Sequence, residues 1–259
     1  MKIHAMFNLL RLSLVLLLPL LLGSEGCGGL EIGAPPAPMI WFVGFDVTTS
    51  ITEEEFTGYK QIARKAVLAR LKNNDQVYVL RVDSDPQDSA ESFSLNGGKL
   101  GLYQEIQKIN KYIEGQIRQP ENYRGTTNIG GFLAYVKRNI ANDRKQRQKL
   151  VDQGTLLPPE PIYAAVLFSD GYPVGAQSLD PSEWQDDVAL SVWGVQPQHI
   201  DAMNELCREM GIPGENVQLI RSADVQPTLT HFAREWNRPL NPQLLKALET
   251  NGAVHPIGL

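Results

Sequence analysis

Continuous apolar runs alternate along the chain with segments of helical periodicity. The runs lie at 40–45, 77–82, 162–168, 188–195 and 217–220. Short apolar runs rich in β-branched and aromatic residues are typical of strands buried on both faces of a sheet. Between and after them, apolar side chains at helical spacing predict helices over 53–71, 102–117, 130–150 and 200–210, followed by terminal helical pieces.

This alternation predicts an α/β fold with a doubly wound, mainly parallel central sheet and helices on both faces. The polar stretch after residue 82 contains the turn signal Asn96-Gly97-Gly98, and we interpret that stretch as a loop. In open parallel sheets, ligands bind outside the carboxyl ends of the strands. We therefore expect ligand-binding residues where the apolar runs end.

The first 27 residues have a pattern of their own. A basic start is followed by the apolar run Leu12 to Leu22, which Pro19 interrupts. About 20 apolar residues are needed to span a bilayer, so this run predicts an export signal peptide over 1–27 rather than a stable membrane helix. We expect an exported protein of the cell envelope, either anchored to a membrane or secreted or periplasmic.

Cys27 ends this segment and is followed by Gly28-Gly29, which resembles a bacterial lipoprotein junction. The residues two and three positions before the cysteine, Glu25 and Ser24, depart from the small and aliphatic residues of that pattern. Lipidation of Cys27, with membrane attachment, and ordinary cleavage both stay open. The prolines in 28–38 predict an extended tether.

Composition is typical of one soluble domain, predicted over 39–236, with a helical tail over 237–259. The chain has 259 residues, 42% of them hydrophobic, and a formal net charge of -5, which gives no indication of nucleic-acid binding. Apart from Cys27 the chain has only Cys207, in a helical pattern, where we expect a small buried thiol. A basic cluster over 137–149 favours a solvated helix face, with an anionic partner as the alternative.

Oxygen-bearing side chains follow two of the predicted strands. Asp46-Val47-Thr48-Thr49-Ser50 ends the first, and Ser169-Asp170-Gly171 ends another. The glycine-rich loop 124–131 contributes Thr127 and leads into a predicted helix. Carboxylates and hydroxyls at one sheet edge are the oxygen ligands that hard divalent cations prefer.

These three segments, in this order, resemble the metal-ion-dependent adhesion site of von Willebrand factor A (vWA) domains. The resemblance covers roughly 39–232 and implies a doubly wound fold. It implies that Thr48, Ser50 and Thr127 ligate a metal directly, while Asp46 and Asp170 act directly or through water. Thr126 stands where glycine is common in the family, so Thr126 is an alternative to Thr127. The implied partner is a protein that presents an Asp or Glu to the metal, which we expect to be Mg²⁺, with Mn²⁺ or Ca²⁺ as alternatives.

Other functions stay open beside this one. Taken singly, the same residues satisfy local backbone groups as caps and turns, which would leave a metal-free scaffold for protein interaction. A Mg²⁺-dependent hydrolase is less favoured, because the sequence contains neither a Gly-x-Ser-x-Gly elbow nor a Walker loop. We therefore expect no enzymatic activity. The segment Tyr172-Pro173-Val174 is either a rim of the site or a plain surface turn.

Overall fold

The computed structural model describes residues 37–118, 125–174, 177, 184, 188–221 and 241–251. The predicted signal peptide with Cys27 lies outside the described residues, as does the tether up to Pro36. Among the residues that are described, none of the helices combines the length and apolar character needed to cross a membrane.

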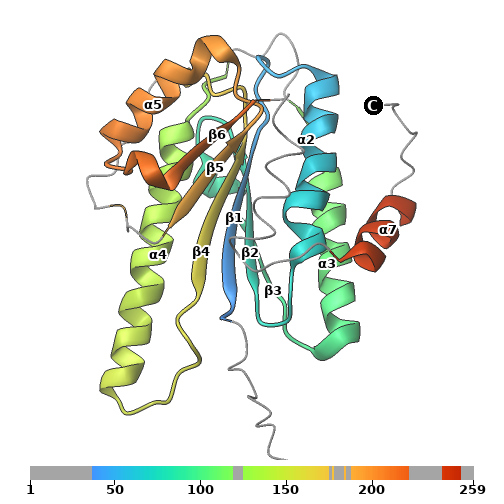
Figure 1. Ribbon diagram of the computed structural model, residues 1–259, viewed down its shortest axis with the longest axis vertical. Coiled ribbons are helices and arrows are strands. Elements are labelled where there is room, and N and C mark those ends of the chain that lie inside the picture. Colours follow the sequence, from blue (N-terminus) through green and yellow to red (C-terminus); the bar gives the residue numbers. More distant parts are fainter. Residues whose placement is uncertain are drawn as a thin grey trace, which may run out of the picture. The chain divides into compact units, whose positions relative to one another are not determined.

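Six strands form one sheet, in the order β3-β2-β1-β4-β5-β6 (Figure 1). All neighbouring strands are parallel except β2 and β3. The predicted α/β fold with a mainly parallel sheet is therefore confirmed. The strands are β1 (Met39–Asp46), β2 (Gln76–Val82), β3 (Glu91–Ser94), β4 (Ile162–Phe168), β5 (Ala189–Trp193) and β6 (Val217–Ile220).

Helices cover both faces of the sheet (Figure 1). One face carries α2 (Glu53–Ala66), α3 (Gly98–Glu114) and α7 (Pro242–Asn251), and the other carries α4 (Ile129–Asp152) and α5 (Ile200–Glu209). Short 3₁₀ helices lie at Leu68–Arg70, Pro86–Ser89, Pro197–His199 and Gly214–Asn216.

The central strand β1 contributes side chains to two hydrophobic cores, one on each face of the sheet. Trp41 and Phe45 pack with the side chains of α2 and α3, whereas Ile40 and Phe42 pack with those of α4 and α5. Because successive strand residues point to opposite faces, a continuous apolar run is what a strand covered on both sides requires. On α5, Cys207 is a free thiol with 3% exposure, which confirms the predicted buried cysteine.

The structure differs from the sequence-based prediction in one strand and one helix boundary. The stretch after residue 82, interpreted as a loop, contains the strand β3. This antiparallel edge strand has only Phe93 partly buried. Four residues that are mostly exposed give too weak an apolar pattern to predict a strand. The helix predicted over 53–71 ends at Ala66, and a 3₁₀ helix follows it.

Candidate metal site

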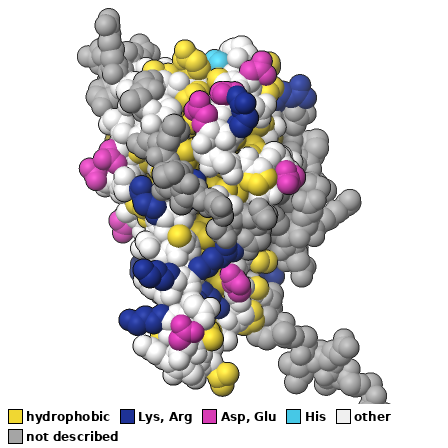
Figure 2. Space-filling model, turned by 90° about the vertical axis from the view of Figure 1, so that its left-hand side faces the viewer, with side chains coloured by type: hydrophobic (Ala, Val, Ile, Leu, Met, Phe, Trp, Pro, Cys, Tyr) yellow, Lys and Arg dark blue, Asp and Glu magenta, His cyan; other side chains and the backbone are white. Residues whose placement is uncertain are grey.

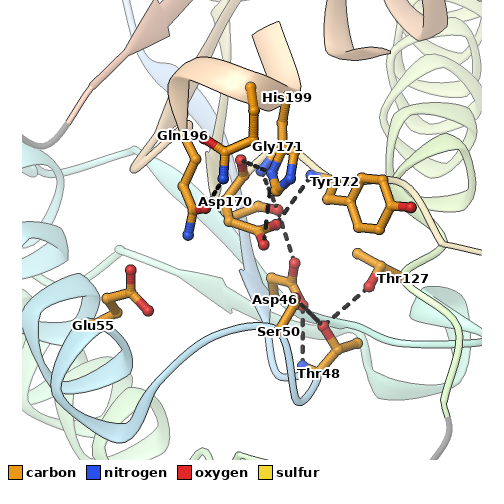
Figure 3. Close-up of polar contacts among 12 residues, drawn as sticks. Asp46, Thr48, Ser50, Glu55, Thr127, Asp170, Gly171, Tyr172, Gln196 and His199 are labelled. Carbon is orange, nitrogen blue, oxygen red and sulfur yellow. Dashed lines mark hydrogen bonds and ion pairs between the residues drawn. The ribbon is translucent and has the colours of Figure 1, made fainter.

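The predicted site residues meet at the carboxyl edge of the sheet, which we call the site edge. Strands β1 and β4 are parallel neighbours, and their register pairs Phe45 with Phe168. The residues that follow this pair, Asp46 and Ser169, are therefore neighbours, and Asp170 comes directly after Ser169, which brings Asp46 and Asp170 to one place (Figure 3). Sequence order alone predicts that both lie at this edge, but the pairing of β1 with β4 is what makes them neighbours.

The carboxylate of Asp46 is fully buried and held at both oxygens. Its Oδ1 accepts hydrogen bonds from the backbone N–H of Thr48 at 3.0 Å and from Thr48 Oγ1 at 2.6 Å. Its Oδ2 accepts from Ser169 Oγ at 2.8 Å. This contact of Ser169 was not predicted from the sequence. It follows from the strand register, since Ser169 comes directly after β4 and lies beside Asp46.

Three hydroxyl groups form a chain next to this carboxylate (Figure 3). Thr48 Oγ1 lies 3.1 Å from Ser50 Oγ and accepts a hydrogen bond from Thr127 Oγ1 at 3.0 Å. Thr48 and Thr127 are buried, whereas Ser50 is exposed. Of the two threonines in the glycine-rich loop, Thr127 is thus the one whose hydroxyl joins the site.

Local backbone contacts fix the loop that carries Thr127. The backbone N–H of Thr127 donates to Val174 O at 3.0 Å, and Val174 N–H donates back to Thr127 O at 3.3 Å. Next along the chain, Asn128 caps α4 by accepting a 2.8 Å hydrogen bond from Gly131 N–H on its Oδ1. A Cβ at position 131 would lie 2.6 Å from Asn128 Nδ2, so the cap requires glycine there.

Asp170 stands opposite the hydroxyl chain. Its Oδ1 accepts from the backbone N–H of Tyr172 at 3.0 Å, and its Oδ2 lies 3.8 Å from His199 Nδ1. The backbone oxygen of Asp170 is 3.1 Å from the same ring nitrogen. The ring of His199 stacks on that of Tyr172, with 4.7 Å between centroids. Sequence reasoning missed His199, because a histidine at a helix start carries no signal for a contact 29 residues away.

Burial raises the pKa of both carboxyl groups. The pKa of Asp46 rises to about 7, because desolvation outweighs its hydrogen bonds to Thr48 and Ser169, and the nearby charge of Asp170 adds to the rise. Desolvation also raises the pKa of Asp170, against the lowering effects of the Tyr172 N–H and of His199. Two carboxylates that burial destabilises in their charged form favour a positive ligand between them.

The donor set consists entirely of oxygen. Among the residues that the structure describes, no cluster of three or more His, Cys, Asp or Glu side chains is arranged to hold a metal. The site instead combines the carboxylates of Asp46 and Asp170 with the hydroxyls of Thr48, Ser50 and Thr127. Such a set fits a hard cation such as Mg²⁺ or Mn²⁺ and lacks the nitrogen and sulfur ligands that softer metals prefer.

Comparison with solved structures finds resemblances at low sequence identity. Proximal thread matrix protein 1 from the mussel byssus is 15% identical at a TM-score of 0.45, over 76% of this chain and 48% of its own. A von Willebrand factor type A protein from Catenulispora acidiphila is 15% identical at a TM-score of 0.44, over 77% and 43%. The conserved hypothetical protein BatB from Bacteroides thetaiotaomicron is 11% identical at a TM-score of 0.46, over 77% and 98%.

This chain thus spans less than half the length of the first two of these structures. No family model and no curated protein matches the sequence.

Proposed function

We propose that this protein binds one divalent cation at the site edge and, through it, a carboxylate of a partner protein. The cation would be held by Thr48, Ser50 and Thr127, with Asp46 and Asp170 as direct or water-mediated ligands. The observation that carries the proposal is the buried carboxylate of Asp46, fixed by hydrogen bonds and joined to a chain of three hydroxyls.

The side chains of the site differ in exposure, as a cation shared between this protein and a partner requires. Asp46, Thr48 and Thr127 are at most 4% exposed, whereas Ser50 is open to solvent. Tyr172 is 47% exposed and its ring lies against His199 beside Asp170. A partner carboxylate would approach from the Ser50 side, past an aromatic rim, and its charge would complete the neutralisation of the cation.

Mg²⁺ suits this donor set better than Ca²⁺. Ca²⁺ takes six to eight oxygen ligands, commonly from several carboxylates, whereas Mg²⁺ keeps several waters and needs few protein ligands. Here the protein offers two carboxylates and three hydroxyls, and Mn²⁺ prefers the same oxygen ligands.

The site favours binding over hydrolysis. A hydrolase needs a general base that can reach a water molecule beside the metal. His199 is the one histidine among the described residues, and its Nδ1 is directed at the backbone oxygen of Asp170. If a phosphatase or protease panel with added Mg²⁺ finds activity that disappears on Asp170→Ala, the binding proposal is wrong. A metal-free scaffold remains the second candidate, and the absence of metal binding would favour it.

Manganese relaxation provides a direct test of an open coordination position. Water bound to Mn²⁺ on the protein speeds the relaxation of bulk water protons, and a carboxylate that replaces this water lowers the effect. We expect a short peptide containing Asp to lower the relaxation rate in a saturable way and the matched peptide with Asn to leave it unchanged. Thr127→Ala should abolish both metal loading and the peptide effect, whereas Thr126→Ala should keep them. Equal effects of the Asp and Asn peptides would contradict the proposal.

We further propose that the protein is exported and held at the cell envelope through its N-terminal segment. Acylation of Cys27 would give this attachment, and ordinary signal cleavage would give a released protein. A Cys27→Ser variant distinguishes the two, since loss of partition into detergent identifies Cys27 as the anchor and unchanged partition excludes it.

A further inference from the structure

Helix α4 is longer than the sheet beneath it. It has 24 residues, which corresponds to about 36 Å at a rise of about 1.5 Å per residue. The neighbouring β4 has seven residues, or roughly 23 Å. Since α4 starts directly after Thr127 at the site edge, its far end passes beyond the amino ends of the strands (Figure 1).

This far end makes no contribution to the hydrophobic core. The last buried residue of α4 is Ile140, so the three turns from Ala141 to Asp152 contain no buried side chain. One side of this segment contacts the protein, since Asp143 and Arg144 meet Tyr163. Its exposed side is available to a partner that lies outside the domain.

The projecting turns and the loop after them present a basic and apolar surface, which we call the basic tip and define as residues 144–156. It contains four basic residues and one acidic residue, in a chain whose net charge is -5. Three aliphatic side chains are exposed on it, Leu150 at 40%, Val151 at 52% and Leu156 at 99%. Figure 2 shows Lys and Arg side chains over the lower part of the face that it presents, with Asp and Glu side chains among them and hydrophobic side chains at the lower end.

Hydrogen bonds hold the loop against the helix, so the apolar side chains stay together. The backbone N–H of Thr155 donates to Leu150 O at 3.0 Å. Further along, Arg147 Nη2 donates to Pro158 O at 2.7 Å, and Arg144 pairs with Glu160 at 3.2 Å. These contacts use the two arginines on the protein itself and leave the exposed Lys145 and Lys149 on the surface of the tip.

The chain also enters the domain at this end. Strand β1 begins at Met39, and Ile162 N–H donates to Pro38 O at 2.9 Å, next to the segment that follows the basic tip. Cys27 is ten residues before Ala37. Ten extended residues reach at most about 35 Å. A chain held to a membrane at Cys27 would therefore keep Ala37, at this end of the domain, within about 35 Å of the bilayer.

We propose that the basic tip docks on an anionic lipid bilayer, with Lys145 and Lys149 at the headgroups and Leu150, Val151 and Leu156 at the boundary with the acyl chains. Exposed lysines beside aliphatic side chains are the pattern that binds such surfaces. The site edge lies at the opposite end of the strands, so docking leaves the candidate metal site facing away from the bilayer and open to a partner.

Vesicle sedimentation tests the docking with a protein that begins at Gly28. This protein keeps every described core residue, since these begin at Met39, and it lacks the signal peptide and Cys27. It should sediment with vesicles of phosphatidylglycerol and phosphatidylethanolamine and stay in solution with phosphatidylcholine alone. A basic side chain near an anionic surface is worth roughly a fivefold gain in binding. The double variant Lys145→Glu/Lys149→Glu, which removes two such side chains, should therefore bind at least about 25-fold more weakly.

Matched variants on the other face of the sheet serve as controls. Lys111 is an exposed lysine on α3, and Ile117 is 79% exposed just after that helix. Arg118, the next residue, pairs with Glu53 at the start of α2, so Ile117 lies toward the site edge. We expect Leu156→Ser to weaken vesicle binding, and Lys111→Glu/Ile117→Ser to leave it unchanged.

A fluorescent label locates the contact. In this protein Cys207 is 3% exposed, so an environment-sensitive thiol label attaches to one introduced cysteine. On anionic vesicles, the label at Leu156→Cys should shift to shorter wavelength and the label at Ile117→Cys should not. Protein that stays in solution with anionic vesicles, or shifts that are equal at the two positions, would overturn the proposal. All binding is measured in EDTA, so the result is independent of the metal site.

Discussion

At the residue scale, the candidate site places carboxylates, which water solvates well, in buried positions. Asp46 carries a carboxylate that water would solvate, yet the side chain is fully buried and three hydrogen bonds from Thr48 and Ser169 only partly replace the lost water. Either a proton or a cation relieves this conflict, so the two should compete for the same carboxylate.

This competition predicts a pH dependence for stabilisation by Mg²⁺. The pKa of Asp46 is about 7 in the metal-free folded protein and about 3.8 in an ordinary peptide. The metal-free fold therefore holds an extra proton between these values, and the stability that this proton contributes is lost as the pH rises through about 7. A carboxyl group must be ionised to ligate a metal. Mg²⁺ should raise the melting temperature clearly at about pH 8 and little at about pH 5.5, as measured by scanning calorimetry.

The control for this prediction is Asp46→Asn, which keeps the shape of the side chain without a titrating group. In this variant, Mg²⁺ should have no effect on the melting temperature at either pH. An equal Mg²⁺ shift at both pH values in the unaltered protein would show that Asp46 is not the group that responds to the metal.

Most residues of the candidate site were predictable from the sequence because they belong to segments at strand ends. The sequence places Asp46, Thr48, Ser50 and Asp170 in those segments and Thr127 in the glycine-rich loop before a helix, and the structure brings all five together. Ser169 and His199 were not predictable in the same way. Their contacts depend on the register between β1 and β4 and on the path of the chain after β5, which a single sequence does not encode in a readable pattern.

At the element scale, the helix that follows the first strand is tied to the site loop by its cap. Thr52 Oγ1 accepts a 3.1 Å hydrogen bond from the backbone N–H of Glu55. In return, Glu55 Oε2 accepts from the N–H and the hydroxyl of Thr52, at 2.8 Å each. This reciprocal cap begins α2 two residues after Ser50, so it fixes the position from which the site loop returns to the domain.

Removal of the cap hydroxyl should cost measurable stability. We expect Thr52→Ala to lower the free energy of unfolding by about 1 kcal/mol, because the backbone N–H of Glu55 in the first turn of α2 loses its acceptor. Urea denaturation measures the change. Thr49→Ala is the matched control, since Thr49 is an exposed threonine three positions earlier in the same loop. A loss of equal size in both variants would contradict the role of the cap.

Elements with strong apolar periodicity were predicted well, and those without it were not. The strand Val217–Ile220 and the helix that contains Cys207 lie where the pattern placed them. Strand β3 escaped prediction because it is held by backbone hydrogen bonds to β2 and buries little of its own surface. The early end of α2 also escaped, since apolar side chains continue through Val67, Leu68 and Ala69 into the 3₁₀ helix.

At the scale of the whole molecule, the C-terminal segment completes a core that the first half of the chain begins. Helix α7 comes from the segment predicted as a helical tail, and its Leu244 and Leu248 are 2% and 0% exposed among side chains of α2 and α3. The backbone N–H of Asn241 also donates to Ala69 O at 2.8 Å. A sequence pattern predicts the helix, but the surface that it covers follows only from the assembled fold.

Truncation of one side chain in α7 tests whether this packing contributes to the domain. Leu248→Ala should lower the free energy of unfolding by roughly 2–5 kcal/mol, the range for deletion of a buried leucine side chain. Chemical denaturation followed by tryptophan fluorescence measures the loss. Glu249→Ala, at the exposed neighbouring position, should change stability by less than about 0.5 kcal/mol. A small effect of Leu248→Ala would indicate that α7 is dispensable for the fold.

The two proposed contacts of this protein lie at opposite ends of the sheet. The candidate metal site lies at the carboxyl ends of the strands, and the basic tip and the first residues of β1 lie at the amino ends. In the proposed arrangement, one end of the domain contacts a membrane while the other binds a partner. The proposed partner binding depends on the site edge being a metal site.

Calorimetric titration of Mg²⁺ and of Mn²⁺ into the protein that begins at Gly28 tests that point most directly, beside the variants Asp46→Ala and Thr126→Ala. We predict saturable binding to one site, lost in Asp46→Ala and kept in Thr126→Ala, whose hydroxyl is outside the hydrogen-bonded chain of the site. If the unaltered protein binds neither ion, or if Asp46→Ala binds both as well as the unaltered protein does, the candidate site is not a metal site.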